Sequence, residues 1–520
     1  MDFITSSYDI LQSAVKEAST DALPPPDTIL QATATLPTSL PTSGLGEEAT
    51  RKHLISDICP AFNGQKITGN YYGFVTGGVL PIAEVADNIV TAFDQNVGVH
   101  LPDQSISSTV EDRALSMLAE MVHIGEEFQG RTFTTGATAS NILGLACGRE
   151  AVVKTRLDAA GETGSVGELG ILGACLKAGI KEIRVLTSMG HSSLYKAASV
   201  VGIGRVSVKD IPSSKDEPWK LDLEALEDEL KSSKDGIAHI VVISAGEVNT
   251  GRFATNGVST NRKIRELCDK YRAWFHVDAA FGLFARSLPP TPEFQALILA
   301  SSGLELADSI GGDCHKMLNV PYDCGVFWTR TSETMFSAFQ NANAAYLSTG
   351  PSSIPSPLNI GIENSRRFRA LPVYSVLVAY GRSGFAEIFA KQVRLARAIS
   401  AYIDQHPAFE LLAQGPPPSH PTAPFHHLSL SSPQPTGTNT PIERPPYENT
   451  HIIVIFKAKD ERVNNGLVDG ICGTRRMHVS GTVWQGKKAA RIAVSTWKVE
   501  VDRDLDVVRG VLEEVLKGST

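Results

Sequence analysis

The segment from about residue 105 to residue 385 alternates short apolar runs with amphipathic stretches. Ile183-Arg-Val-Leu, His239-Ile-Val-Val-Ile and Trp274-Phe-His-Val are runs of strand length. Such runs are typical of parallel strands buried on both faces, and the stretches between them, such as 221–231 and 258–271, are expected to be helical. This alternation predicts an α/β layered domain with a mainly parallel sheet.

A chain of 520 residues is too long for one core and predicts two or three subdomains. Residues 1–20 are expected to contain a short helix, and the Pro/Thr/Ser-rich stretch from Asp21 to Gly44 is expected to be an extended linker. Gly415 to Glu448 holds ten of the 29 prolines and is expected to be a flexible insertion, for which a plain surface loop is favoured over a partner-binding motif. We divide the chain into residues 1–48 (helix and flexible linker), 49–104 (an N-terminal segment), 105–385 (a large domain) and 386–520 (a small domain containing the insertion 415–448).

The composition excludes several classes of protein. A net charge of -8 and a pI near 5.9 do not favour nucleic-acid binding, and no basic run favours an anionic membrane. No run of 18 apolar residues occurs, and the N-terminus does not resemble a secretory signal. Seven scattered cysteines lack metal-ligand spacing, so no metal site is expected and the thiols suit a reducing compartment. We expect a soluble, cytoplasmic protein.

Four polar features follow predicted strands, where ligands gather in α/β sheets. The first is Thr134-Thr-Gly-Ala-Thr-Ala-Ser-Asn141, which opens a helix and could hold an anion, although these residues are also ordinary helix caps. The second is His191, which could stack on a planar cofactor, and the third is Thr250, which could contact its ring substituents. The fourth is Asp278 together with Lys316.

Asp278 ends a buried strand, and Lys316 follows the next one. A buried carboxylate is costly unless it is paired, and a protonated pyridine nitrogen is a suitable partner. A lysine amine can form a Schiff base with an aldehyde. These are the two groups that pyridoxal 5'-phosphate (PLP) chemistry requires, and the other three features supply a phosphate site and a stacking ring in the right order.

With these residues in place, the sequence resembles the group II PLP-dependent amino-acid decarboxylases. The resemblance runs from about Gly69 to Trp497. It includes Phe74-Val-Thr-Gly-Gly78, His276-Val-Asp278-Ala-Ala280, Asp313-Cys-His-Lys316, Ser365-Arg-Arg-Phe-Arg and Arg491-Ile-Ala-Val-Ser. The segments 315–325 and 479–484 are most similar to a fungal and bacterial branch whose substrates are poorly defined.

The resemblance implies fold type I of the PLP-dependent transferases, with a mainly parallel seven-stranded sheet in the large domain and a small C-terminal α/β domain. It also implies a homodimer in which residues 49–104 pack on the partner. The implied roles are the Schiff-base lysine for Lys316, the pyridinium partner for Asp278, and the two ring faces for His191 and Ala280. The residues expected to surround the phosphate and the ring substituents are Gly136, Ala137, Thr138, Thr250 and His315.

Asp313 and Tyr346 need separate comment. Family members often carry Asn at the position of Asp313, and a carboxylate close to a phosphate is repulsive unless it is compensated. Tyr346 aligns with a loop whose tyrosine protonates the substrate carbon after CO2 leaves. Aldehyde-forming relatives typically have Phe there. A phenol can deliver a proton and a phenyl ring cannot, so Tyr346 favours decarboxylation over aldehyde formation, with an ordinary surface tyrosine as the alternative.

The substrate is the least constrained part of the prediction. Phe74, Thr76 and Val79 are expected to line the side-chain pocket, which favours an aromatic or other nonpolar amino acid, with an unusual amino acid of secondary metabolism as the alternative. No additional basic residue is expected in this pocket, and salt bridges are the favoured role for the arginines of 366–369. The other possible functions are a PLP-dependent aldehyde synthase or other lyase on the same fold, an oxidoreductase, and a catalytically silent homologue. Gly202-Ile-Gly204 lacks the third glycine of a dinucleotide-binding motif, which disfavours the oxidoreductase.

Overall fold

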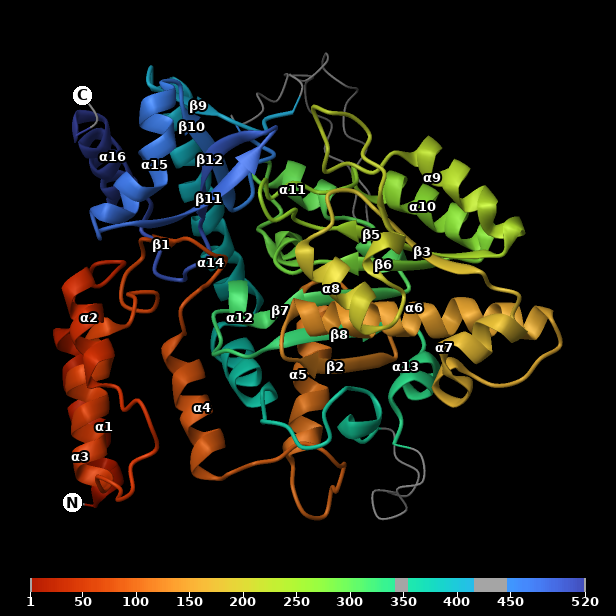
Figure 1. Cartoon of the computed structure of the whole chain (residues 1–520), viewed down its shortest axis with the longest axis horizontal. Helices are drawn as coiled ribbons and strands as arrows, with labels where there is room; N and C mark the ends of the chain where they lie inside the picture. Colours follow the sequence, from red (N-terminus) through yellow and green to blue (C-terminus); the bar gives the residue numbers. More distant parts are fainter. Residues whose placement is uncertain (1, 342–353, 416–446, 519–520) are drawn as a thin grey trace, which may run out of the picture.

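The computed structural model describes residues 2–341, 354–415 and 447–518. Its larger sheet has seven strands and lies in the middle of the molecule (Figure 1). Strand β8 runs antiparallel to both of its neighbours, and the other adjacent pairs are parallel, as the sequence predicts. In spatial order the strands are β2 (Gly130–Thr134), β8 (Gly325–Thr329), β7 (Ser309–Asp313), β6 (Trp274–Asp278), β5 (Ile237–Ser244), β3 (Glu182–Thr187) and β4 (Val208–Asp210).

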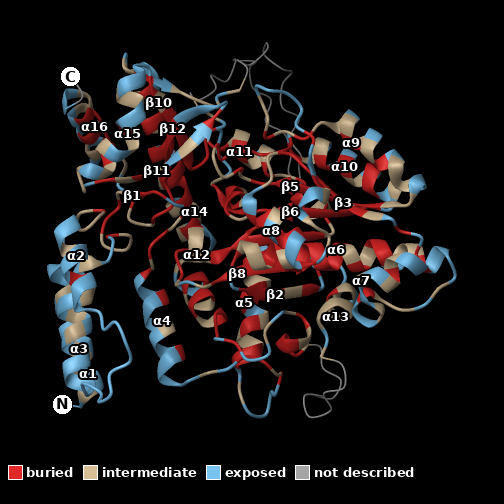
Figure 2. Cartoon of the chain, in the orientation of Figure 1, coloured by how far each residue is buried: buried red, intermediate tan, exposed pale blue. Residues whose placement is uncertain are grey.

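Alternate residues of the central strands enter two different hydrophobic clusters. Ile240 and Val242 of β5 pack in the cluster that contains α6, whereas Val241 and Ile243 pack in the cluster on the opposite face. Both faces of β5 are therefore buried (Figure 2), which explains its continuous apolar sequence. The helices of this domain are α5 (Ser107–Met121), α6 (Ala137–Ala159), α7 (Val166–Lys177), α8 (Ser192–Val200), α9 (Leu223–Leu230), α10 (Val258–Tyr271), α11 (Gln295–Ala300), α12 (Cys314–Met317) and α13 (Ser332–Phe339).

The smaller sheet has five strands and belongs to the C-terminal region, with one exception. Its edge strand β1 comes from the N-terminal segment and pairs in parallel with β11. The small α/β domain is therefore confirmed, but it also includes residues far upstream of the predicted boundary at 386. The strands are β1 (Tyr71–Tyr72), β11 (His478–Trp484), β12 (Lys487–Ala493), β10 (Ile453–Ala458) and β9 (Phe409–Leu411), and the helices are α15 (Glu461–Gly473) and α16 (Val501–Gly518).

Helix α14 (Ala370–Gln405) connects the two sheets. It spans the predicted domain boundary at 386 and bends at Gly381, whose φ of 58° lies in the left-handed region. Buried apolar residues as far as Val393 pack on the core of the large domain, and those from Leu395 onward pack in the core of the small domain. Among the described residues, none of the helices, including this one, is long and apolar enough to cross a membrane.

The N-terminal region is more helical than the sequence predicts. Helices α1 (Phe3–Glu17), α2 (Pro26–Thr35) and α3 (Glu47–Lys52) lie together at one side of the molecule (Figure 1), and α4 (Pro81–Ala92) follows. Helix α2 lies in the stretch for which an extended linker is predicted, so the structure differs there. Proline is well tolerated at the first position of a helix, where its missing N–H has no intrahelical partner, and Pro26 occupies that position.

Candidate active site

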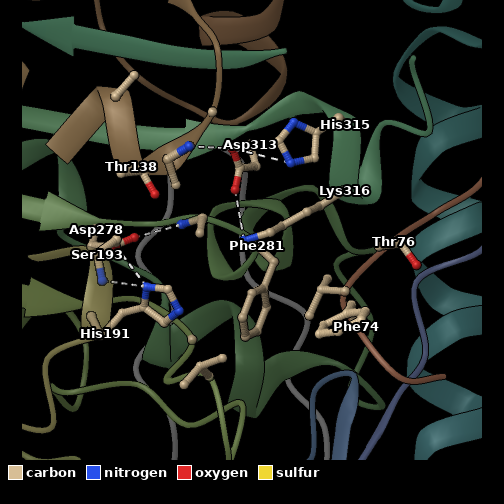
Figure 3. Close-up of a pocket in the computed structure, with 18 of the residues that line it drawn as sticks. Phe74, Thr76, Thr138, His191, Ser193, Asp278, Phe281, Asp313, His315 and Lys316 are labelled. Carbon is tan, nitrogen blue, oxygen red and sulfur yellow. Dashed lines mark hydrogen bonds and ion pairs between the residues drawn. The ribbon is translucent and has the colours of Figure 1, made fainter. Parts of the chain in front are cut away.

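The strands of the large sheet bring the predicted site residues to one edge. Strand β2 is antiparallel to β8, which is antiparallel to β7, so β2 runs in the same direction as β7, β6, β5 and β3. The carboxyl ends of these five strands therefore meet at the same edge. A cavity of about 390 Å³ opens there (Figure 3), lined by residues that include Phe74, Thr76, Gly136, Ala137, Thr138, His191, Asp278, Ala280, His315 and Lys316.

Lys316 extends from α12 into this cavity. Its amine forms an ion pair with Asp313, with 2.8 Å between Nζ and Oδ2, and lies 5.8 Å from the centre of the Phe281 ring. The other carboxylate oxygen of Asp313 accepts a hydrogen bond of 2.5 Å from the backbone N–H of Ala137. The negative charge of Asp313, which would repel a phosphate, is thus balanced by the Lys316 amine and by the first turn of α6.

The start of α6 is shaped for close approach. Gly136 has a φ of 150°, and a Cβ at this position would lie 3.2 Å from the His315 ring and 3.3 Å from Asp313. The side chains of Ala137 and Thr138 are half-buried beside it and border the cavity. Free N–H groups at the start of a 23-residue helix, a neighbouring hydroxyl and a lysine amine fit the phosphate and aldehyde groups of PLP.

Asp278 lies at the end of β6 and is held by Asn141 from α6. The Asn141 side-chain N–H donates to Asp278 Oδ2 at 2.8 Å, and the backbone N–H of Ala280 approaches Oδ1 at 3.3 Å. Asp278 is only 7% exposed, and it borders the cavity. This geometry leaves a carboxylate available to a protonated ring nitrogen, as the sequence predicts.

Donors and acceptors can be assigned in only one way along the chain of hydrogen bonds that supports Asp278. A carboxylate only accepts, so the Asn141 amide nitrogen faces Asp278 and its oxygen faces His276 Nε2 at 3.0 Å. Burial lowers the pKa of His276 to about 4, with the Asp278 charge partly offsetting the effect, so the ring is neutral with its proton on Nε2. Its Nδ1 therefore accepts from the Ser309 hydroxyl at 2.8 Å, and Ser309 in turn accepts from the Trp274 indole at 3.0 Å.

The same amide also reaches His191. Asn141 donates to the Ser193 hydroxyl at 3.1 Å, and that hydroxyl lies 2.7 Å from His191 Nδ1. The backbone N–H of Ser193 also donates to Nδ1, so Nδ1 is an acceptor and neutral His191 carries its proton on Nε2. The His191 side chain is exposed at the rim, where it can face a ring and donate a proton.

The opposite wall of the cavity is aromatic. Phe74 is 60% exposed, and Phe281 is buried below Lys316. Tyr322 lies against His315, with 4.7 Å between ring centres and the two ring planes tilted by 42°. Val79, a predicted pocket residue, instead packs against the large hydrophobic core. Three aromatic side chains, those of Phe74, Phe281 and Tyr322, therefore border the cavity.

The expectation that the cavity contains no additional basic residue was wrong. Arg491 of β12 borders it, 5% exposed, and donates to the backbone oxygens of Val248 at 2.6 Å and Gly73 at 3.2 Å. Burial lowers the pKa of Arg491 to about 10, which leaves it charged at neutral pH. The arginines at 366, 367 and 369 do form salt bridges, with Glu111, Asp87 and Asp323.

Thr250, like Val79, does not border this cavity. Thr250 is buried in a turn, where its hydroxyl and backbone N–H both donate to Glu247 Oε2 at 2.8 Å. Ser244, Gly246 and Val248 of the same loop border the cavity instead. Tyr346 lies outside the described residues.

Sequence reasoning missed the roles of Asn141 and Arg491. Asn141 stands at the end of the predicted phosphate motif, four residues after Ala137, and this spacing on a helix could have indicated that the two residues share a face. Arg491 was noted only as part of a C-terminal motif. Its approach to the cavity depends on how the small domain packs, for which the sequence carries no local signal.

Known proteins with similar sequences are amino-acid decarboxylases. L-2,4-diaminobutyrate decarboxylase of Acinetobacter baumannii is 27% identical over 343 residues, which are 64% of this chain and 63% of that protein, so the match spans less than two thirds of its length. L-aspartate decarboxylase dtxS4 of Metarhizium robertsii is 26% identical and covers 70% and 68% of the two chains. Aromatic-L-amino-acid decarboxylase of Sus scrofa is 27% identical over 410 residues, 77% of this chain and 72% of that protein.

Solved structures share the fold over nearly the full length. Oryza sativa TDC with PLP and tryptamine has a TM-score of 0.77 at 19% identity, covering 99% of this chain and 97% of that chain. Rhodiola rosea 4-hydroxyphenylacetaldehyde synthase has a TM-score of 0.75 at 18% identity, covering 100% and 99%. The model of the pyridoxal-dependent decarboxylase conserved domain matches residues 82–425, well over half of the chain. The protein therefore belongs to the pyridoxal-dependent decarboxylase family.

Proposed function

We propose that this protein is a PLP-dependent carboxy-lyase that converts an L-amino acid to the corresponding amine and CO2. The observation that carries the proposal is the arrangement of Lys316, Asp278 and His191 around one cavity at the start of α6. A primary amine, a buried carboxylate and an exposed imidazole are the groups that hold PLP and manage protons beside it. Membership of the family makes PLP the cofactor.

Bound PLP supplies a ring that accepts the electrons of the broken Cα–carboxylate bond. The chain's own residues hold and tune that ring. Asp278, oriented by the Asn141 amide, would stabilise a proton on the ring nitrogen, and the α6 terminus with Thr138 would hold the phosphate. Lys316, which pairs with Asp313 in the described structure, would hold the cofactor aldehyde and help to release the product.

Proton delivery is the step that separates an amine product from an aldehyde. His191 presents Nε2–H at the rim of the cavity, since Nδ1 is occupied by Ser193. Tyr346 is the second candidate donor to the substrate carbon, and its phenol favours simple decarboxylation. The structural similarity to 4-hydroxyphenylacetaldehyde synthase keeps aldehyde formation as the alternative function.

The aromatic wall formed by Phe74, Phe281 and Tyr322 supports an aromatic substrate side chain. The charge of Arg491 suits a carboxylate ligand. The α-carboxylate that every amino acid carries can be that ligand, so Arg491 does not require an acidic side chain. We therefore favour an aromatic L-amino acid. Aspartate and diaminobutyrate, the substrates named for two relatives, are the alternatives to test together with unusual amino acids of secondary metabolism.

We further propose that the working unit is a cytoplasmic homodimer. Helix α4 turns Val85, Ile89 and Phe93 outward, 52%, 45% and 71% exposed, while Ala83 and Ala86 face the core. An exposed apolar stripe on a helix is characteristic of a protein interface. The N-terminal segment that contains α4 would then pack on the partner, and all seven cysteines are free thiols, which suits a reducing compartment.

The deciding experiment is product analysis. We would incubate the PLP-loaded protein with aromatic, acidic, diamino and unusual amino acids, and identify products and CO2 by mass spectrometry, with Lys316→Ala as the inactive control. An amine that is absent with the variant supports decarboxylation and identifies the substrate. An aldehyde with ammonia would establish the alternative, and in that case Tyr346→Phe should leave the product unchanged. PLP binding without any product from the full panel would count against the proposal.

A further inference from the structure

Arg252 is a buried arginine whose side chain has no partner in the described residues. It follows the turn that contains Thr250 and is 7% exposed. Its Nε is buried without a hydrogen bond, and no side-chain hydrogen bond or ion pair joins it to any described residue. Burial lowers the pKa of Arg252 to about 10, so the guanidinium is charged at neutral pH. The Nε–H is therefore unsatisfied, and the charge of the nearby Glu217 carboxylate only partly offsets the effect of burial on the guanidinium.

The other buried arginines of the described chain are all compensated. A buried charge that lacks a partner is strongly unfavourable, whereas one held by a carboxylate or carbonyl oxygens is tolerated. Arg252 thus stands apart from the remaining four, whose partners are Glu111 for Arg366, Asp323 for Arg369, the carbonyl oxygens of Glu293 and Glu448 for Arg397, and those of Val248 and Gly73 for Arg491.

Arg252 borders a cavity of about 120 Å³ that shares no lining residue with the active-site cavity. Lys220 adds a second positive charge, and it pairs with Glu217, the one acidic lining residue, at 2.8 Å. The formal charge of the lining is therefore positive. The polar lining residues that can donate hydrogen bonds are Lys220, Arg252, Thr255, Asn256, Gln414 and Asn449, contributed by both the large domain and the start and end of the small-domain segments.

We propose that this cavity binds a small inorganic oxyanion, with phosphate as the reference ligand. The planar guanidinium of Arg252 can donate two parallel hydrogen bonds to two oxygens of such an anion, and amide and hydroxyl donors surround it. A volume of about 120 Å³ suits one tetrahedral oxyanion better than an amino acid or a nucleotide. Trp219 and Phe253 form apolar walls that shield Arg252 and the bound anion from water.

The site is connected to the active-site wall through one short loop. The backbone oxygen of Arg252 accepts from the Glu247 N–H at 2.7 Å, and the Arg252 N–H donates to the Thr250 hydroxyl at 3.2 Å. Glu247 also binds Thr250, and the neighbouring Gly246 and Val248 border the active-site cavity. An anion held by Arg252 therefore stabilises this loop from behind.

The test is equilibrium dialysis of the PLP-loaded protein against radiolabelled inorganic phosphate at constant ionic strength, so that the cofactor already fills its own phosphate site. We expect one phosphate per chain for the unmodified protein and none for Arg252→Met. Arg252→Lys keeps the positive charge but loses the two parallel N–H donors of the guanidinium, and should bind phosphate about tenfold more weakly. Arg262→Met, which removes an exposed arginine on α10, should bind like the unmodified protein.

Thermal unfolding gives an independent readout. Phosphate should raise the midpoint of the PLP-loaded protein by on the order of 2 °C in a saturable way, and Arg252→Met should show no such rise. Without phosphate, Arg252→Met should be at least as stable as the unmodified protein, because it removes an unpaired buried charge. Equal phosphate binding by Arg252→Met and the unmodified protein, or no binding by either, would overturn the proposal. Neither readout depends on catalysis, so the outcome is separate from that of the proposed function.

Discussion

Asp313 places a carboxylate where α6 presents its first free N–H groups, beside the expected phosphate position. In the described structure Lys316 pairs with it, but that amine would no longer do so while it held the cofactor aldehyde. Asp313→Asn should keep the hydrogen bond to Ala137 while removing the repulsion, and we expect PLP affinity to rise about tenfold, or about 1.4 kcal/mol. Absorbance titration of the apoprotein with PLP measures this. Asp216→Asn, an exposed aspartate, serves as control, and weaker binding by Asp313→Asn would contradict the argument.

Asn141 is a positioning residue, because it orients Asp278 without reaching the cavity itself. Asn141→Leu should lower kcat by about 10- to 100-fold with little change in KM, and should shift the absorbance of bound PLP, because the carboxylate loses its orientation. Ser287→Ala is the matched control. It removes a buried hydrogen bond to the backbone oxygen of Met121 and should cost similar stability, about 1–3 kcal/mol, but leaves the contact between Asn141 and Asp278 intact.

A purely structural role for Asn141 would make these two variants alike in kcat and in spectrum. The comparison therefore separates positioning from general stability. Steady-state kinetics, PLP absorbance and urea unfolding on both proteins are the measurements.

At the scale of elements, α4 offers the clearest test of assembly. Val85→Glu places a charge in the middle of its exposed apolar stripe and should convert the expected dimer into a monomer, because a charge in an apolar interface is costly. Light scattering coupled to size-exclusion chromatography measures the mass. Leu172→Glu on α7, where Leu172 is 72% exposed, is the matched control and should leave the mass unchanged. If only Leu172→Glu dissociates the protein, the interface lies on α7 instead.

Elements were predictable where burial dictates the sequence. Strands β3, β5 and β6 are covered on both faces, so their apolar runs were visible, and the groups at their carboxyl ends, such as Asp278, came with them. Helix α2 was not predicted because its prolines also suit an extended chain. Whether Thr250 borders the cavity depends on the direction of one turn, and whether Arg491 does so depends on the packing of two domains. Local periodicity in the sequence encodes neither.

At the scale of the whole molecule, buried neutral histidines make stability depend on pH. Burial lowers the pKa of His451 to about 3, and neither ring nitrogen has a hydrogen-bond partner. Between pH 6.5 and 3 the unfolded chain binds a proton that the folded chain does not, so this residue stabilises the fold fully above pH 6.5 and progressively less below it. The ring stacks on Phe281, 6.1 Å between centres, so His451→Phe suits the site.

We expect His451→Phe to be more stable than the unmodified protein at pH 5, and the advantage to grow by up to about 1.4 kcal/mol per pH unit as the pH falls. Urea unfolding between pH 5 and 8 measures the difference. Parallel pH profiles for the two proteins would show that His451 does not titrate as described. His53→Phe, at an exposed pair with Asp57, controls for removal of a surface histidine.

The chain of hydrogen bonds from Trp274 to His191 has a consequence for comparing relatives and designing inhibitors. Each donor in this chain fixes whether the next group donates or accepts a hydrogen bond. The Trp274 indole and Ser309 do not border the cavity, but they therefore belong to the same functional unit as Asp278. A comparison of relatives that considers only the side chains bordering the cavity would treat Trp274 and Ser309 as residues of the core without a functional role. An inhibitor that requires an acceptor nitrogen at His191 Nε2 would fail here, although every residue it contacts would look suitable.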